Sequence, residues 1–332
     1  MRILIIGGTA FVGRHLTQAA LDAGHEVTLF HRGNTGADLF AAATHLSGDR
    51  NQDLSALADR SFDATIDVCA FFPRQVRSLA AALDGRGGRY VFISSISAYS
   101  DAVPPHFDET GPLAEISDPD ATEITAENYG GLKVACERAS TELFGPDTTI
   151  IRPTYVIGPY DRSYRFDYWV DRLATGGTVL APGDPADPIQ VIDARDQASW
   201  IVSLLERSIT GTYLSASPAP PFGFGQMLAE ISAEVAPAGT ELVWVDSEFL
   251  VAQGVDGNAL PLWAEGDSAG LNQCTASPAA AFAAGLTPRP LRQTVAEIRA
   301  AKPVSARPGR LAPEREADVL AQWTANAAPH PQ

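Results

Sequence analysis

The chain opens with the residues MRILIIGGTAFVG, from Met1 to Gly13, and this stretch decides the fold. The apolar run Ile3–Ile6 has the length and composition of a buried strand, and Phe11–Asp22 has the apolar spacing of a helix. The glycines between them allow a tight turn at Gly7 and close packing of helix against strand at Gly13. A helix N-terminus that follows such a turn binds phosphate, so the stretch predicts a phosphate-binding strand–turn–helix unit.

The same alternation of strand and helix continues through the first half of the chain. Strands are expected at Glu26–Phe30, His45–Leu46, Ala64–Val68, Arg89–Ile93 and Thr148–Ile151, with helices at Arg74–Leu83 and Tyr129–Phe144. Repeated strand–helix units build a parallel sheet, and strands that are apolar throughout fit a sheet buried on both faces. The sequence therefore predicts an α/β protein with a Rossmann-type, doubly wound parallel sheet.

The second half of the chain is less regular and predicts a smaller C-terminal α+β region that binds the substrate. Further elements are expected at Ile189–Ile192, Ala194–Glu206, Thr212–Leu214, Phe224–Val235 and Glu241–Val245. We place the dinucleotide-binding domain at residues 1–153, with 189–206 returning to it, and the substrate-binding region at 154–188 and 207–302. Residues 303–332 then form a linker rich in proline and arginine, with a short amphipathic helix at Glu314–Trp323.

Composition and charge exclude several classes of function. The 332 residues carry 24 Lys and Arg against 40 Asp and Glu, a net charge of −16, and such a surface repels nucleic acid and anionic membranes. The three cysteines are far apart and the six histidines are scattered, which fits a reducing compartment and predicts no metal site. The apolar run near the N-terminus is too short for a signal peptide or a membrane span. We therefore expect a cytoplasmic protein that binds a small molecule.

The residues around the glycine turn indicate the cofactor. Those expected to contact it there are Gly7, Thr9, Ala10, Phe11, Val12 and Gly13. Nicotinamide-binding folds often place a carboxylate at the end of the second strand to hold the adenosine ribose, whereas this chain has His31 and Arg32. A cation there suits a 2′-phosphate, which favours NADP over NAD; a solvated surface arginine is the alternative. Asp49, after the third strand, is expected either to contact the adenine or to form a turn.

A tyrosine and a lysine lie one helical turn apart in the sequence Tyr129-Gly-Gly-Leu-Lys133, so both side chains project from one helix face. A lysine beside a phenol stabilises the phenolate and lowers its pKa, and the tyrosine can then take a proton from an alcohol or return one to a carbonyl. Upstream, the strand Arg89–Ile93 runs into the serine-rich loop Ser94-Ser-Ile-Ser97. Because ligands of parallel sheets bind beyond the carboxyl ends of the strands, a serine of this loop is expected to hydrogen-bond the reacting oxygen.

Together these motifs resemble those of the extended short-chain dehydrogenase/reductases, also called the NAD-dependent epimerase/dehydratase family, over roughly residues 1–215. The turn Gly-Gly-Thr-x-Phe-x-Gly is similar to that of an atypical branch, which includes chloroplast stem-loop-binding-like proteins. The resemblance implies that Ser95, Tyr129 and Lys133 are catalytic. It implies that Tyr129 moves a proton as hydride passes between substrate and nicotinamide, and that Tyr129 and Lys133 also contact the cofactor.

The chain departs from the family pattern at residues that bear on the substrate. Ala10 replaces the middle glycine, Tyr155 replaces an asparagine expected near a diphosphate, and the segment 187–192 lacks an arginine for a nucleotide phosphate. These departures argue against a UDP- or dTDP-sugar and leave a sugar-like or other small polar substrate. The segment 158–169, rich in aromatic and basic residues, suits such a substrate, and a packed lid or dimer surface is its alternative role. Candidate contacts are Ser97, Tyr155, Arg162 and Tyr168, and Ser94 and Ser97 are neighbours expected to substitute for Ser95 or to assist it.

Three reactions use the same catalytic residues. An epimerase oxidises and re-reduces its substrate, a carbonyl reductase releases oxidised cofactor after each turnover, and a dehydratase needs a further acid–base pair that the serine loop does not provide. The sequence therefore favours an epimerase or a reductase. The alternatives are a non-catalytic Rossmann protein that binds RNA or a nucleotide, which the net charge disfavours, and an NADP-binding redox sensor.

A second copy of the chain is the other expected partner. The resemblance implies a homodimer formed through the helix that carries Tyr129. Leu132, Cys136 and Ala139 lie on one side of that helix and are the residues expected at the dimer contact.

Overall fold

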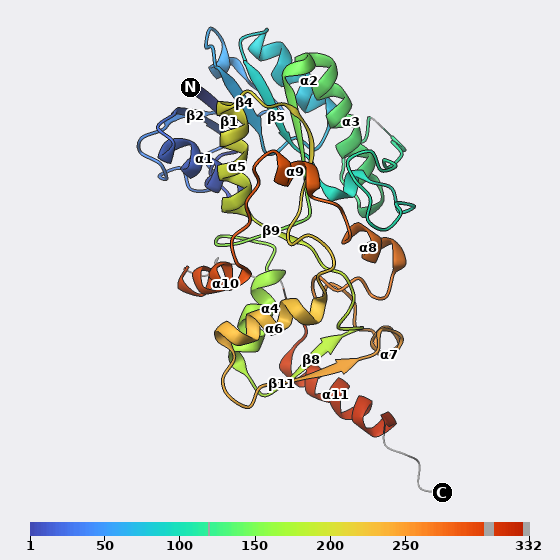
Figure 1. Cartoon of the computed structure of the whole chain (residues 1–332). Helices are drawn as coiled ribbons and strands as arrows, with labels where there is room; N and C mark the ends of the chain where they lie inside the picture. The colour runs from blue at the N-terminus through green and yellow to red at the C-terminus, as the bar shows by residue number, and fades with distance from the viewer. Residues whose placement is uncertain (119, 302–308, 328–332) are drawn as a thin grey trace, which may run out of the picture. The chain divides into compact units, whose positions relative to one another are not determined.

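A seven-stranded parallel sheet organises the first half of the chain in the computed structural model, which describes residues 1–118, 120–301 and 309–327 (Figure 1). Its strands are β1 (Arg2–Ile6), β2 (Glu26–His31), β3 (Thr44–Ser47), β4 (Ala64–Asp67), β5 (Arg89–Ile93), β6 (Thr148–Pro153) and β10 (Gly211–Ser215). Their order across the sheet is β10-β6-β5-β4-β1-β2-β3, and every neighbouring pair is parallel. The direction of strand addition reverses between β1 and β4, where a doubly wound sheet opens a crevice for its ligand. The predicted Rossmann-type fold is confirmed.

Helices cover both faces of the sheet. They are α1 (Phe11–Asp22) and α5 (Ala194–Glu206) on one face, and α2 (Pro73–Leu83) and α3 (Ala126–Phe144) on the other (Figure 1). In β1, Ile3 and Ile5 pack in the core with α1 and α5, whereas Leu4 and Ile6 pack in the core with α2 and α3. Burying a side chain of this size is worth about 1.5–3 kcal/mol, so a strand with two buried faces is apolar at every position.

The described chain divides into two compact units. Unit 1 comprises residues 1–156, 191–219 and 276–288 and holds the large sheet with its helices, together with α9 (Ala279–Ala283). The short strands β7 (Tyr155–Ile157) and β9 (Val191–Asp193) pair with each other. Unit 2 comprises residues 157–190, 220–275 and the described residues from 289 onward. Its elements are α4 (Phe166–Thr175), β8 (Thr178–Pro182), α6 (Phe224–Val235), β11 (Glu241–Val245), α7 (Ser247–Ala252), α8 (Ser268–Gln273), α10 (Leu291–Ala300) and α11 (Pro313–Ala327).

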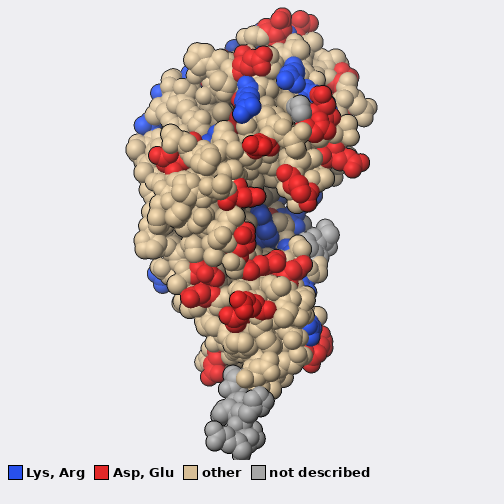
Figure 2. All heavy atoms as spheres, turned by 90° about the vertical axis from the view of Figure 1, so that its right-hand side faces the viewer, with Lys and Arg blue, Asp and Glu red and all other residues tan. Residues whose placement is uncertain are grey.

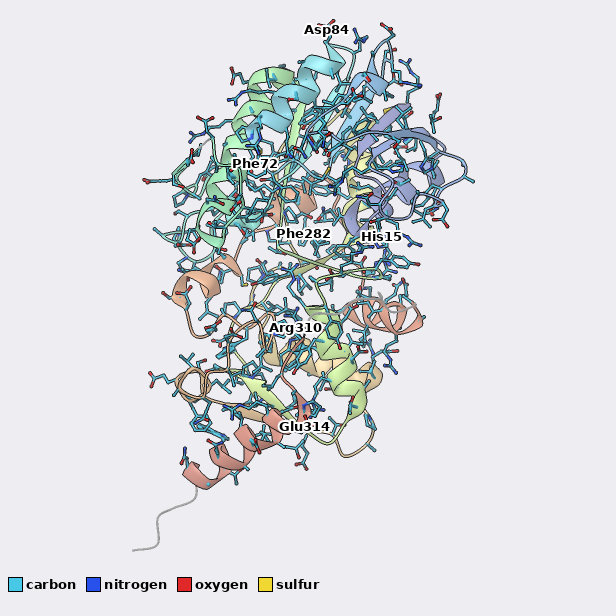
Figure 3. All side chains as sticks on the ribbon, turned by 180° about the vertical axis from the view of Figure 1, so that it is seen from behind. His15, Phe72, Asp84, Phe282, Arg310 and Glu314 are labelled. Atoms are coloured by element: carbon cyan, nitrogen blue, oxygen red, sulfur yellow. The ribbon has the colours of Figure 1, made fainter. Side chains whose placement is uncertain are left out.

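Within unit 2, the C-terminal segment is tied to the small parallel sheet of β8 and β11. The buried carboxylate of Glu316 on α11 accepts the backbone N–H of Leu180 at 2.8 Å. Just before α11, Arg310 donates to backbone oxygens of unit 2, and its side chain lies among others of that unit (Figure 3). The predicted helix Glu314–Trp323 is confirmed and is longer than expected, and residues 303–308 of the expected linker lie outside the described residues.

Most elements begin and end close to where the sequence predicts. The bounds of α1, β5, α5, α6 and β11 are those expected. Helix α3 begins at Ala126, before the predicted start at Tyr129, because Thr125 and Asn128 form a capping box. The Thr125 hydroxyl accepts the Asn128 N–H at 3.3 Å, and the Asn128 side-chain oxygen accepts the Thr125 N–H at 2.8 Å. Strand β9 begins at Val191, two residues later than expected.

The expected substrate-binding region at 207–302 is wrong in two places. Residues 207–219 belong to unit 1, because β10 pairs with β6 at the edge of the large sheet. Residues 276–288 also belong to unit 1, where Trp200 Nε1 donates to the backbone oxygen of Ala284 at 3.3 Å. A strand or helix of five residues, such as β10 or α9, carries too little periodicity for a sequence to show where it packs.

Candidate functional site

The glycine turn after β1 has the geometry that its sequence predicts. Gly7 has a φ of +91°, which favours glycine, and a Cβ there would lie 3.0 Å from the sulfur of Cys69. A Cβ at Gly13 would lie 2.3 Å from the backbone oxygen of Gly7, so only glycine lets α1 pack this close to the turn. The hydroxyl of Thr17 donates to the backbone oxygens of Gly8 and Gly13 at 2.8 and 2.9 Å and ties the helix to the turn.

The first turn of α1 is open to an anion. Its N-cap residue, Ala10, has no side-chain group that could accept from the first-turn N–H groups, and the first turn carries no acidic residue. These backbone donors and the helix dipole favour a phosphate at this position. Phe11 and Val12 begin the helix and are half-buried.

A cavity of about 300 Å³ lies beside the turn, in unit 1. It is lined by residues that follow β1, β2, β3 and β4 at their carboxyl ends. Of the predicted cofactor residues it includes Gly7, Thr9, Ala10, His31, Arg32 and Asp49, whereas Phe11, Val12, Gly13, Tyr129 and Lys133 are not among its lining. The sequence reasoning missed Gly33, Asn34, Thr35, Gly48, Arg50, Asn51, Cys69, Phe71 and Gln75, which the rule that ligands bind beyond the carboxyl ends of the strands could have found.

A buried ion pair holds Arg50, one of the residues that line this cavity. Arg50 donates to both carboxylate oxygens of Asp67, at 2.6 and 2.8 Å, and Tyr90 donates its hydroxyl to the same carboxylate at 2.9 Å. Burial opposes ionisation of Asp67, yet the Arg50 guanidinium and these hydrogen bonds hold the pKa of the carboxyl below its usual range. Asp49 takes the turn-forming role, because its carboxylate accepts the backbone N–H of Asn51 at 2.9 Å, although it also lines the cavity.

Lys133 is buried and joins the end of β5 to the segment that follows β4. Its Nζ donates to the backbone oxygens of Ala70 and Ile93, at 3.1 and 2.9 Å. It lies 6.0 Å from the ring centroid of Tyr129 and 5.0 Å from that of Phe71, which also lines the cavity. Burial lowers the pKa of Lys133 to about 8. The lysine therefore lies between the predicted catalytic tyrosine and the cavity wall.

The serine loop places its hydroxyls in two different environments. Ser95 caps the short 3₁₀ helix η2 (Ile96–Ala98): its Oγ accepts the Ser97 N–H at 3.1 Å and donates to the Ser97 Oγ at 3.2 Å. Both hydroxyl-bearing residues are half-exposed. Ser94 is buried and donates to the Glu137 carboxylate at 2.5 Å, so it cannot stand in for Ser95 as expected.

Two glycines bring α3 against this loop. A Cβ at Gly130 would lie 2.2 Å from the backbone oxygen of Ser97, and one at Gly131 would lie 2.2 Å from the backbone oxygen of Glu115. Gly130 must therefore be this small for the helix to approach the serine loop, and Gly131 must be this small for the helix to pack against the segment at Glu115. The serine loop, Tyr129 and Lys133 lie together at the carboxyl ends of β4 and β5, as expected from the sequence.

A buried network of hydrogen bonds and one ion pair holds the serine loop against β6 and α3. Arg152, at the end of β6, donates to both carboxylate oxygens of Glu137 on α3, at 2.9 and 2.6 Å. The same arginine donates to the hydroxyl of Tyr99 at 2.8 Å. Burial raises the pKa of Tyr99 to about 12. With the Ser94 hydrogen bond, this network joins β6, α3 and the serine loop.

The weaker predictions on substrate and dimer contacts have a mixed outcome. Tyr155 is half-buried in β7, and Arg162 is exposed in unit 2. Tyr168 is only 5% exposed and packs against the ring of Trp169 at 5.0 Å, so this tyrosine belongs to the interior rather than to a ligand surface. The three residues expected at a dimer contact of α3 are buried in the core of their own chain, which makes that expectation wrong; they are Leu132, Cys136 and Ala139.

Charge, metal-ligand chemistry and the hydropathy of the helices add three further findings. Acidic side chains are spread over the face seen in Figure 2, with fewer basic ones among them. Within the described ranges, no group of three or more His, Cys, Asp or Glu side chains could hold a metal ion. Among those same residues, no helix is both long and apolar enough to cross a bilayer.

Comparisons with known proteins agree with this geometry. A model of the NAD dependent epimerase/dehydratase family matches residues 3–70 and 39–213 of the chain. The chain is 28% identical over 221 residues to the chloroplast stem-loop binding protein of 41 kDa b from Arabidopsis thaliana, which is 61% of this chain and 55% of that protein. The chain thus spans about half the length of this relative.

Solved structures with the same fold include two named as epimerases. UDP-glucuronic acid 4-epimerase from Bacillus cereus, in complex with NAD, has a TM-score of 0.63 and 17% identity, and the match covers 90% of this chain and 97% of that one. A human epimerase family protein with NADPH has a TM-score of 0.63 and 19% identity, with 90% and 99% covered. At such identities the likeness shows the fold alone.

Proposed function

Since the chain belongs to the NAD dependent epimerase/dehydratase family, we propose that it is an NAD(P)-dependent oxidoreductase or epimerase. It acts at a hydroxyl-bearing carbon of a sugar-like or other small polar substrate. The reaction uses Ser95, Tyr129 and Lys133. Dinucleotide binding is typical of the family, and the cavity beside the glycine turn has the lining that such a cofactor needs.

One observation carries this proposal. The ammonium of Lys133 is almost fully buried. It is held by the backbone carbonyls of Ala70 and Ile93, and it lies near Phe71, a residue of the cavity wall. Burial of an ammonium costs folding free energy that its hydrogen bonds offset only in part, and strongly shifted pKa values cluster at functional sites. No stability argument alone explains a lysine at this position, whereas a catalytic role explains both its burial and its place near Tyr129.

The side chains divide the chemistry between them. A nicotinamide cofactor, when bound, supplies the hydride acceptor or donor. In the oxidative direction, the hydroxyl of Ser95 holds the substrate oxygen by a hydrogen bond, and the phenolate oxygen of Tyr129 accepts the hydroxyl proton as the carbonyl forms. In the reductive direction Tyr129 returns the proton to the oxygen. The charge of Lys133 stabilises the phenolate of Tyr129.

The cavity lining supports a preference for NADP. Its wall carries His31 and Arg32 where a ribose-binding carboxylate would favour NAD. Arg32 is exposed, so its guanidinium is free to turn toward a 2′-phosphate without loss of a buried contact. The carboxylate of Asp49, which also lines the cavity, accepts a hydrogen bond within its own turn.

The decisive experiment identifies the cofactor that the protein carries. We would purify the chain without added nucleotide, denature it, and analyse the released small molecules by mass spectrometry. A stoichiometric dinucleotide indicates an epimerase, which recycles its cofactor in the site. An empty protein that binds NADPH reversibly indicates a reductase. A protein that binds neither NAD nor NADP contradicts the proposal.

The Tyr129→Phe variant separates catalysis from binding. We expect it to bind the dinucleotide as the parent does, because the phenol oxygen exchanges the proton and does not build the cavity. Substrate turnover is expected to disappear. Turnover that survives in Tyr129→Phe would show that another group moves the proton.

A second candidate function rests on the relative that binds a stem-loop. The chain is 28% identical to it over 221 residues, and an RNA-binding role would need no catalytic residues. The net charge of −16 opposes such binding. We therefore place RNA binding second.

A further inference from the structure

Two histidines form a hydrogen-bonded pair at the wall of the cofactor cavity. His31 ends β2 and His45 lies on the neighbouring strand β3, and their rings meet edge to face with 5.1 Å between centroids. The Nε2 of His31 lies 2.9 Å from the Nδ1 of His45. His31 lines the cavity, whereas His45 does not.

The neighbours of the pair decide where its protons lie. The backbone N–H of Gly33 donates to the Nδ1 of His31 at 3.0 Å, so that nitrogen carries no proton. The Nε2 of His31 must then donate to the Nδ1 of His45, and the Nε2 of His45 donates to the backbone oxygen of Phe40 at 3.3 Å. Every ring nitrogen is engaged, and the chain of hydrogen bonds is complete only when both rings are neutral.

An added proton breaks this chain at one of two places. A proton on the Nδ1 of His31 removes the acceptor of the Gly33 N–H, and a proton on the Nδ1 of His45 sets two N–H groups against each other. Either change releases a support of the turn formed by Gly33, Asn34 and Thr35. All three residues of that turn line the cavity.

We propose that His45, acting through His31, is a positioning residue that holds the Gly33–Thr35 turn in the shape that receives the adenosine ribose of the cofactor. The turn loosens, and dinucleotide binding weakens, when the pair takes up a proton. The inference rests on the proposed cofactor site. It assigns control of the part of the site that receives the adenosine ribose to the two histidines, of which only His31 lines the cavity.

The surroundings support the direction of this effect. The other titratable or charged residues of the cavity wall are Arg32, Asp49, Arg50 and Cys69. Two of these are cations, and the carboxylate of Asp49 is used in its own turn. Burial and the neighbouring His45 lower the pKa of His31. The His31 ring therefore takes up a proton at a lower pH than a free imidazole does.

Calorimetric titration with NAD and NADP at pH 7.5 and pH 5.5 tests the proposal. The double variant His31→Gln, His45→Gln is the informative one, because each amide keeps a donor and an acceptor without a titrating proton. We expect the parent protein to lose about three- to fivefold in NAD affinity at the lower pH, since a group that must be neutral titrates in this range. The double variant should bind with the same affinity at both values. His106→Gln, at an exposed histidine away from the cavity lining, should keep the parent's pH dependence. An equal loss in the parent and the double variant overturns the proposal.

A measurement without cofactor separates this inference from the proposed function. The amide signal of Gly33 in the nitrogen–proton NMR spectrum should shift with the same midpoint as the His31 ring, and the shift should vanish in His31→Gln. If neither dinucleotide binds but the two signals titrate together, the proposed function fails while the coupling of the pair to the turn stands. If the Gly33 amide signal does not shift as the His31 ring titrates, the positioning role is wrong, whether or not a dinucleotide binds.

Discussion

At Gly130 the candidate site has no room for a single added carbon atom. Gly130 lies between Tyr129 and Lys133 in the sequence, and a methyl group on it would come within 2.2 Å of the backbone oxygen of Ser97. Real Cβ atoms do not approach an oxygen this closely. The distance between the tyrosine helix and the serine loop is therefore set by a residue that takes no part in the chemistry.

A change from glycine to alanine within a helix usually stabilises a protein, whereas Gly130→Ala should destabilise this one. Alanine gains about 0.5–1 kcal/mol over glycine through helix propensity, whereas forcing a methyl group into a filled space costs about 1–3 kcal/mol. We expect a net loss of unfolding free energy in urea denaturation and a much larger relative loss of turnover, because α3 must move away from Ser97. Gly309→Ala is the control, since a Cβ at Gly309 meets nothing within 4 Å. Unchanged stability and turnover in Gly130→Ala would show that the loop yields easily.

The buried amine of Lys133 should make stability depend on pH in a defined direction. Its folded-state pKa of about 8 lies below the ordinary lysine value of 10.5. Between these two values the unfolded chain holds a proton that the folded chain has released, so the unfolding free energy rises as pH rises. We expect the parent to gain roughly 2 kcal/mol between pH 7 and pH 9.5 relative to Lys133→Met, measured by urea unfolding of both proteins. Parallel pH profiles would mean that the ammonium is not held in a desolvated place.

At the scale of elements, the hydrogen bonds among Ser94, Glu137 and Arg152 fix how helix α3, strand β6 and the serine loop lie against one another. Glu137 lies one turn beyond Lys133 on α3, and its carboxylate joins that helix to β6 and to the serine loop. A rotation of α3 that displaced Tyr129 would have to break these bonds. The buried ion pair is thus a positioning device for the side chains on the exposed end of the same helix.

Glu137→Gln should test this role. The change leaves the buried guanidinium of Arg152 without its counter-charge, and breaking a buried pair in this way costs about 3–5 kcal/mol. We expect a loss of that size in urea unfolding. The exposed Glu142→Gln on the same helix should change stability by less than about 0.5 kcal/mol.

A double variant, Glu137→Leu with Arg152→Met, separates stability from positioning. Replacing both charges by apolar groups should restore most of the stability, since a buried ion pair is seldom better than good packing. Turnover should stay low, because the hydrogen bond from Ser94 is still absent. Full recovery of turnover would assign the network a purely structural role.

Elements with local signals could be predicted from the sequence, and contacts between distant residues could not. The turn at Gly7 and Gly13, the strand β5 and the helix α5 each follow from spacing within a dozen residues. The pairing of Arg50 with Asp67 joins the loop after β3 to the last residue of β4, and nothing near either residue in the sequence indicates the other. Burial of Tyr168 was also unpredictable, because an aromatic residue in a polar segment suits a ligand as well as a core.

At the scale of the whole chain, charge separates the two candidate functions. The net charge is −16, and Figure 2 shows acidic side chains over much of one face. Arg50 and Arg152 form ion pairs with buried carboxylates and therefore add little to the electrostatic field at the surface. A dinucleotide avoids this field by binding at backbone N–H groups in a cavity, whereas a stem-loop RNA presents phosphates across a broad surface.

This difference leads to a prediction about salt. Binding of RNA through lysine and arginine releases counterions and therefore weakens as salt increases, with a slope set by the number of phosphate contacts. For this chain we expect no retention of a labelled stem-loop RNA on a filter at either 20 or 200 mM salt, since lowering the salt only strengthens the repulsion. A basic RNA-binding protein of similar size is the positive control. Retention at low salt that falls steeply at high salt would reveal a local basic surface that the net charge conceals, and it would move RNA binding ahead of hydride transfer as the function of the chain.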